Sequence, residues 1–161
     1  MAMLTIRCET GDDVEVATDS LVGAKLCDLN LHRALLEGHD LRGADLSRSV
    51  LRSAWLEDAN LEGAVLDDAR LPACNAARAR FTRARLRGAL LCAGRFAGAD
   101  FTNADLRYSN AAGAYMRGAV LVGANLANSN LDRTDLRAAL ADASTVWPVD
   151  FDYLAHGVLI A

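Results

Sequence analysis

The sequence predicts a solenoid, a chain that turns a corner in every short unit and winds around a thin apolar column. The first observation is a five-residue register: from position 21 to position 136 every fifth residue is apolar, and eighteen of these are leucine. The second is that the position two residues earlier is alanine in fifteen of twenty-four units and another small residue in six more. An internal repeat this dense takes precedence over every other pattern in the chain.

The period of five excludes the two common secondary structures. On a helix, five residues turn about 140°, so successive leucines would scatter around the circumference. On a flat strand, side chains alternate between faces, and an odd spacing would send successive leucines to opposite sides. The chain must therefore turn once per unit and return the large apolar residue and its small partner to the inside. Nine of the twelve glycines lie two residues after the inward residue, where a corner is expected.

The unit is clearest in the runs ADLSR (44–48), ANLEG (59–63), ADFTN (99–103) and ANLAN (124–128). A small residue, Asp or Asn, then Leu or Phe, followed by two variable positions, resembles the pentapeptide-repeat family. The resemblance implies an all-β fold, a right-handed quadrilateral parallel β-helix with four units and twenty residues per coil, and about six coils. With this geometry, Phe81 and Phe101 share a side and are expected to stack, and Phe96 fills the volume that Ala76 leaves empty.

Three segments are expected. Residues 1–18 alternate in polarity around an acidic turn, which predicts a β-hairpin that caps the N-terminal end of the column. Residues 19–146 form the β-helix, and its first coil is atypical because Leu29 and His39 occupy positions meant for small residues. Residues 147–161 form a C-terminal tail.

The tail has two interpretations, which the sequence leaves open: a cap on the last coil, or a dimer contact of the kind that several family members make with their C-terminal ends. Outward apolar residues near this end give either a tail or a partner something to cover. The residues involved are Val120, Val122, Leu140, Trp147, Phe151 and Tyr153.

Composition and spacing argue against several classes of protein. The three histidines (32, 39 and 156) fall in the first coil and in the tail, at opposite ends of the expected rod, and no nucleophile or phosphate-binding motif is present, so we expect no enzyme, no cofactor and no metal site. The four cysteines lack metal-ligand spacing and are expected to be reduced thiols of a cytoplasmic protein. No stretch approaches a membrane span, and no secretion signal is visible.

A belt of arginines is the main charge anomaly, because no acidic residue lies between Asp68 and Asp100. Its members are Arg70, Arg78, Arg80, Arg83, Arg85, Arg87 and Arg95. Such a block either attracts a phosphate or an acidic partner, or forms ion pairs with neighbouring coils. A twenty-residue coil predicts the pairs Asp58–Arg78, Asp67–Arg87, Arg80–Asp100 and Arg85–Asp105, and leaves Arg70, Arg83 and Arg95 unpaired on three sides. Because no single phosphate track results and aromatic stacking partners are missing, direct nucleic-acid binding is not expected.

Trp55, Arg95 and Tyr115 fall on one predicted side of the coil, and Arg95 could lie against Tyr115. Trp55 beside Leu35 is either structural cover or a contact site. Together with Arg70 and Arg83, these residues form the candidate interaction surface.

The leading functional interpretation is a non-catalytic protein-interaction scaffold with an unidentified protein partner. The alternative comes from the resemblance: characterised relatives protect DNA gyrase from quinolones or peptide toxins through a dimeric, acidic rod that mimics DNA. Under that alternative, this protein would modulate or inhibit DNA gyrase or another topoisomerase and so protect the cell against an antibiotic or a toxin. The net charge of −4 and the arginine belt fit such a mimic poorly.

Overall fold

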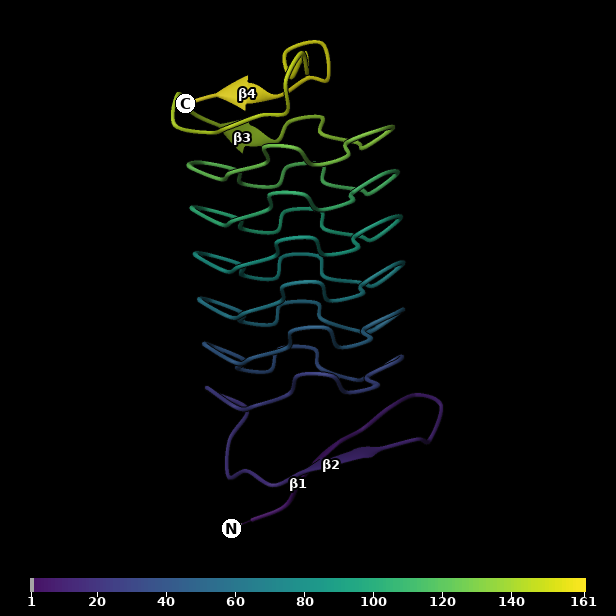
Figure 1. Ribbon diagram of the computed structural model, residues 1–161. Coiled ribbons are helices and arrows are strands. Elements are labelled where there is room, and N and C mark those ends of the chain that lie inside the picture. Colours follow the sequence, from purple (N-terminus) through teal and green to yellow (C-terminus); the bar gives the residue numbers. More distant parts are fainter. Residues whose placement is uncertain (1) are drawn as a thin grey trace.

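The computed structural model describes residues 2–161 as a column of stacked four-sided coils, with the N-terminal hairpin at one end and the C-terminal tail at the other (Figure 1). Within residues 2–161, strands of two or three residues occur only at the ends: β1 (Leu4–Ile6) and β2 (Val14–Val16), then β3 (Leu140–Ala141) and β4 (Leu159–Ile160). Between them, each side of a coil contributes a single-residue bridge to the next coil. None of the described residues forms an apolar helix of membrane-spanning length.

The coil takes twenty residues. Parallel bridges join residues i and i+20 throughout the column, such as Asn30 to Val50 and Trp55 to Asn75. Four five-residue units therefore complete one turn, as the resemblance implied. We call the row Leu35, Trp55, Asn75, Arg95, Tyr115 and Asp135 the tryptophan side, because bridges connect each of these residues to the next.

The interior is the column of large apolar residues that the register predicts. All inward positions from 21 to 136 are buried. Phe81 and Phe101 stack with centroids 4.8 Å apart and planes at 5°, which confirms the expected pair and equals the spacing of adjacent β-strands. Phe96 lies edge-on to Phe81 and folds back over Gly94, where an added Cβ would lie 2.5 Å from the ring. The small position of that unit is glycine because the phenylalanine ring occupies the space.

Each corner is closed by local hydrogen bonds. The backbone N–H of the next small residue donates to the carbonyl of the inward residue, as from Ala34 to Leu31 at 3.1 Å. The second residue after each inward residue from 21 to 136 has a left-handed φ, between +53° and +68°. The side chain of Asp or Asn before the inward residue accepts the N–H two positions on, as in Asn110 to Ala112 at 3.1 Å. This Asx turn explains why the repeat favours Asp or Asn there.

The N-terminal segment forms the expected antiparallel hairpin, in which Leu4 pairs with Val16 and Ile6 with Val14. It lies against the first coil, where the N–H of Leu35 donates to the carbonyl of Arg7 at 2.7 Å. Ile6, Cys8 and Val16 are buried, so the hairpin contributes to the same core as the repeats.

The two large residues of the first coil differ in burial: Leu29 is half-buried and packs against the edge of the core, whereas His39 is exposed. At Leu29 the normal corner bond is replaced. The hydroxyl of Ser49, one coil further on, accepts the N–H of Leu29 and donates to the carbonyl of Leu26. Ser49 thus closes a corner that its neighbour's size has opened.

The tail begins with a one-residue insertion, because Asn125 bridges Val146 rather than residue 145. Trp147 then stacks on Phe151 and Tyr153, with centroids 5.6 and 5.2 Å away. The chain returns through the buried Val158 and ends in β4, which pairs in parallel with β3.

Candidate interaction surface

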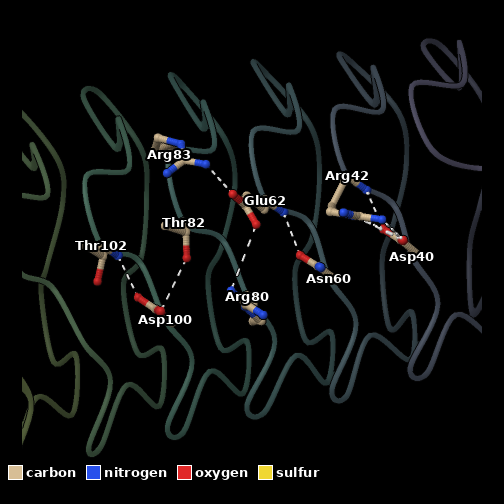
Figure 2. Close-up of polar contacts among 9 residues, drawn as sticks. All are labelled: Asp40, Arg42, Asn60, Glu62, Arg80, Thr82, Arg83, Asp100 and Thr102. Atoms are coloured by element: carbon tan, nitrogen blue, oxygen red, sulfur yellow. Dashed lines mark hydrogen bonds and ion pairs between the residues drawn. The ribbon is translucent and has the colours of Figure 1, made fainter.

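The arginine belt is largely neutralised by acids of the preceding coil. Arg83 and Arg80 both reach Glu62, the second at 3.9 Å, so one carboxylate serves two guanidinium groups (Figure 2). The expectation that Arg83 is unpaired was therefore wrong. Arg78 is held by Glu57 at 2.7 Å and by Asp58 at 2.9 Å, and this contact lowers the pKa of the Asp58 carboxyl.

Of the four ion pairs expected between directly stacked residues, only Asp58–Arg78 forms among residues 2–161. Arg85 pairs instead with Asp67, which also accepts the backbone N–H of Arg87 at 3.2 Å. An arginine side chain is long enough to reach diagonally to an acid in a neighbouring row of outward side chains. Strict stacking therefore does not determine its partner.

A second type of pair lies within one corner. In the sequence Asp-Leu-Arg, the guanidinium folds back on the aspartate two residues earlier, as in Asp135–Arg137 at 2.6 Å. The same geometry occurs in Asp40–Arg42 and Asp105–Arg107. The hydrogen bond from Arg137 lowers the pKa of Asp135 to about 2. These pairs were not expected from the sequence, although the three-residue motif Asp-Leu-Arg marks each of them.

Seven basic side chains make no ion pair within residues 2–161. They are Arg7, Lys25, Arg52, Arg70, Arg87, Arg95 and Arg117. Most lie on different sides or at the ends of the column. Arg95 and Arg117 differ because both line one hollow on the tryptophan side.

This hollow has a volume of about 580 Å³. Its lining includes Arg95 and Tyr115, which bridge each other on adjacent coils, and Tyr115 is 56% exposed. No cation–π contact between these two side chains is found in the described chain, so both are available to a ligand. The flanking corners contribute four methyl side chains to the lining of the hollow, at Ala73, Ala77, Ala93 and Ala97. We call it the alanine groove.

The groove continues toward the N-terminal end through a second hollow that shares Ala73 and Arg95 with the first and includes Trp55. There the indole N–H of Trp55 donates to Glu9 at 3.3 Å, and Arg33 pairs with Glu9 at 2.9 Å. The hairpin thus holds the partly exposed Trp55 at one end of the groove. Arg70 lies on another side of the column, in the row of Val50 and Leu90, and does not reach this surface.

At the C-terminal end, Val120 and Leu140 bridge each other, and both are half-buried, as is Val122. Trp147, Phe151 and Tyr153 pack against the core. The more exposed apolar residues are ones that the sequence did not single out: Val149 at 88%, Leu154 at 62%, Leu159 at 55% and Ile160 at 49%.

The titratable groups outside this surface are dispersed. His32 and His39 lie in the first coil, whereas His156 stacks on Phe151 in the tail. Cys74 occupies an inward small position, and burial raises the pKa of its thiol to about 12. Across residues 2–161, no three His, Cys, Asp or Glu side chains come close enough to hold a metal ion.

These features define a class of protein: a four-sided β-helical solenoid that presents outward side chains in straight rows. A family model for pentapeptide repeats matches eight copies over residues 24–63, 54–91 and 99–137. The chain belongs to the pentapeptide-repeat family, and its fold is the right-handed β-helix solenoid of that family.

Solved structures of other family members resemble this chain. HetL, a protein of Nostoc sp. strain PCC 7120 involved in heterocyst differentiation regulation, is 28% identical over 74% of this chain and 65% of its own, with a TM-score of 0.52. The pentapeptide-repeat protein alr5209 from Nostoc PCC 7120 is 30% identical over 73% and 84%, with a TM-score of 0.42. The fluoroquinolone resistance protein QnrB1 is 16% identical over 91% and 88%, with a TM-score of 0.40. No functionally curated protein matches the sequence.

Proposed function

We propose that this protein is a non-catalytic interaction scaffold whose protein partner docks on the tryptophan side of the column. The observation that carries the proposal is the alanine groove, where Arg95 and Arg117 form no ion pair within residues 2–161, whereas most other arginines of the central coils are ion-paired. Exposed charge next to aromatic and apolar surface is characteristic of interaction sites. Regular coils keep such a surface rigid, which limits the entropy lost on binding.

Photo-crosslinking tests this proposal. A photoreactive phenylalanine analogue is introduced at Tyr115 or, as a matched control, at Tyr108, because the two tyrosines are 56% and 59% exposed. In the native cell, we expect a discrete crosslinked species from position 115 and none from position 108. No adduct from position 115, or the same adducts from both positions, would contradict docking on this side.

The alternative is a DNA-mimicking modulator of DNA gyrase. A mimic needs a line of uncompensated acids along the rod. Within residues 2–161, the acids without an ion pair lie mainly at the two ends, and only Asp68 and Asp100 lack one between residues 46 and 141. This distribution favours the scaffold. A gyrase supercoiling assay with and without a quinolone decides: inhibition or protection at micromolar protein would support the alternative.

We also propose that residues 1–18 and 147–161 close the two ends of the column, and that the C-terminal end pairs with a second copy. β4 is bonded to β3 along one edge only, and its Leu159 and Ile160 are about half exposed. Open strand edges and apolar end surfaces favour association. Light scattering after gel filtration should give a dimer for the full chain and a monomer for Leu159→Glu. A full-length monomer, or a dimer that survives Leu159→Glu, would refute the contact.

A further inference from the structure

The alanine groove carries the positive charges of Arg95 and Arg117, which favour an anionic ligand. The inference about that ligand rests on the proposed docking function. Arg95 and Arg117, which form no ion pair within residues 2–161, both line this hollow, in a chain of net charge −4. Among the described residues that line the groove, Asp135 is the one acid; it is bound by Arg137 at 2.6 Å, and the nearby charge of Arg117 contributes less than this hydrogen bond to lowering its pKa. Arg87, by comparison, lines a hollow together with Asp67 and Asp68, so its charge is balanced locally.

The lining restricts the ligand further. Four alanines give the groove an apolar base, so a ligand that carries only charge would leave these methyl groups exposed to water. Tyr115 adds an aromatic surface and a phenolic hydroxyl. The ligand that complements this lining carries anionic groups and small apolar groups together.

The backbone of the groove cannot accept another strand. Asn75, Arg95 and Tyr115 each bridge both the preceding and the following coil, so their hydrogen bonds are used. A guest must therefore lie across the coils and be held by its side chains. From Trp55 to Asp135 there are four coil steps, or roughly 19 Å at the usual strand spacing, which is the length of about six extended residues.

We propose that the alanine groove binds an extended acidic peptide segment of a partner protein. Carboxylates two residues apart in the segment lie on one face of an extended chain, about 6.8 Å from each other. This spacing allows them to pair with Arg95 and Arg117 on adjacent coils. Guanidinium groups bind carboxylates through paired, charge-assisted hydrogen bonds. An apolar residue on the same face packs on the alanines and Tyr115. Nucleic acid fits less well, because two arginines and one tyrosine cannot follow a polyphosphate backbone.

The test is fluorescence anisotropy with the full chain and a labelled peptide, Ser-Glu-Ser-Glu-Ser-Leu-Ser, which places two carboxylates and one leucine on the same face of an extended chain. We expect saturable binding that weakens as salt increases. Arg95→Ala and Arg117→Ala should each raise Kd about tenfold, the loss of one charge-assisted pair. Arg70→Ala removes an equivalent unpaired arginine on another side and should change Kd less than twofold. Circular dichroism spectra identical to wild type show that each variant is folded.

Several results would overturn the proposal: equal losses from Arg70→Ala and Arg95→Ala, equal binding of the peptide with Gln in place of Glu, or no binding at millimolar peptide. Tighter binding of labelled oligothymidylate with the same arginine dependence would reassign the groove to nucleic acid. The crosslink at position 115 separates this proposal from docking itself. If that crosslink forms but its site on the partner is not acidic, the docking function stands and the acidic segment is refuted.

Discussion

Replacing Ser49 with alanine should destabilise the first two coils far more than a serine-to-alanine change normally does. Ser49 is fully buried, and its hydroxyl joins the N–H of Leu29 to the carbonyl of Leu26. The substitution removes two hydrogen bonds and leaves the N–H of Leu29 without its partner. Each net hydrogen bond contributes about 1 kcal/mol, and an unsatisfied buried group costs about 1–3 kcal/mol, so we expect a loss of about 2 kcal/mol.

Ser109 provides the matched control. It occupies the same small position of a later unit and is 2% exposed, but its hydroxyl has no hydrogen-bond partner within residues 2–161. Removing an unsatisfied buried hydroxyl should leave stability unchanged or raise it by up to about 1 kcal/mol. The two substitutions are chemically identical, so their difference reports the hydrogen bonds alone.

Urea denaturation followed by circular dichroism measures both variants. With a slope of about 2 kcal/mol/M, Ser49→Ala should lower the midpoint by about 1 M. Leu29→Ala should restore the normal corner bond, so Ser49→Ala should cost about 1 kcal/mol less in that background. Equal effects of the Ser49 and Ser109 substitutions, or no coupling between Leu29 and Ser49, would refute this explanation of the first coil.

Three further predictions concern the left-handed corner residues, the loss of folding stability at low pH and the buried thiol of Cys74. Gly113→Ala should lower the free energy of unfolding by about 1 kcal/mol, because a Cβ there meets nothing within 4 Å and only the left-handed φ of +65° opposes it; an unchanged urea midpoint would contradict this. The pKa of Asp135, lowered to about 2 by the hydrogen bond from Arg137, gives stability that is present above the unfolded value of 3.8 and lost as pH falls toward 2. Urea midpoints measured from pH 5 to pH 2 should therefore fall less steeply for Asp135→Asn than for wild type, and parallel curves would exclude this contribution. Because burial raises the pKa of the Cys74 thiol to about 12, a thiol reagent at pH 8 should modify the half-buried Cys92 in the native state and Cys74 only after unfolding; equal rates by mass spectrometry would show that the column opens.

The inward half of the structure could be predicted from the sequence because one physical constraint repeats in every unit. A large apolar residue and a small partner must return to the axis, and this requirement places Leu66 and Ala64 inside without further information. The same register, with a twenty-residue coil, correctly put Trp55, Arg95 and Tyr115 in one row. Stacking of Phe81 on Phe101 has the same origin.

The positions of the outward side chains were less predictable, because a long charged side chain can reach several partners and the resulting ion pairs have similar free energies. Arg83 reaches the diagonal Glu62, and Arg107 folds back on Asp105 within its own corner. A surface ion pair contributes little, so no strong constraint selects one partner over another. The alanine groove does carry a sequence signal. Written in rows of twenty, the sequence aligns Ala73 with Ala93 and Ala77 with Ala97, on the two corners that flank Arg95.

We propose that partner binding is confined to one side of the column. Nuclear magnetic resonance tests it most directly, by titrating the ¹⁵N-labelled full chain with the acidic peptide and following each backbone amide. We predict shifts concentrated at residues 73–77, 93–97 and 115–117, with the row of Val50, Arg70, Leu90 and Asn110 unaffected. Shifts spread evenly over the four sides, or centred on the C-terminal tail, would contradict the claim.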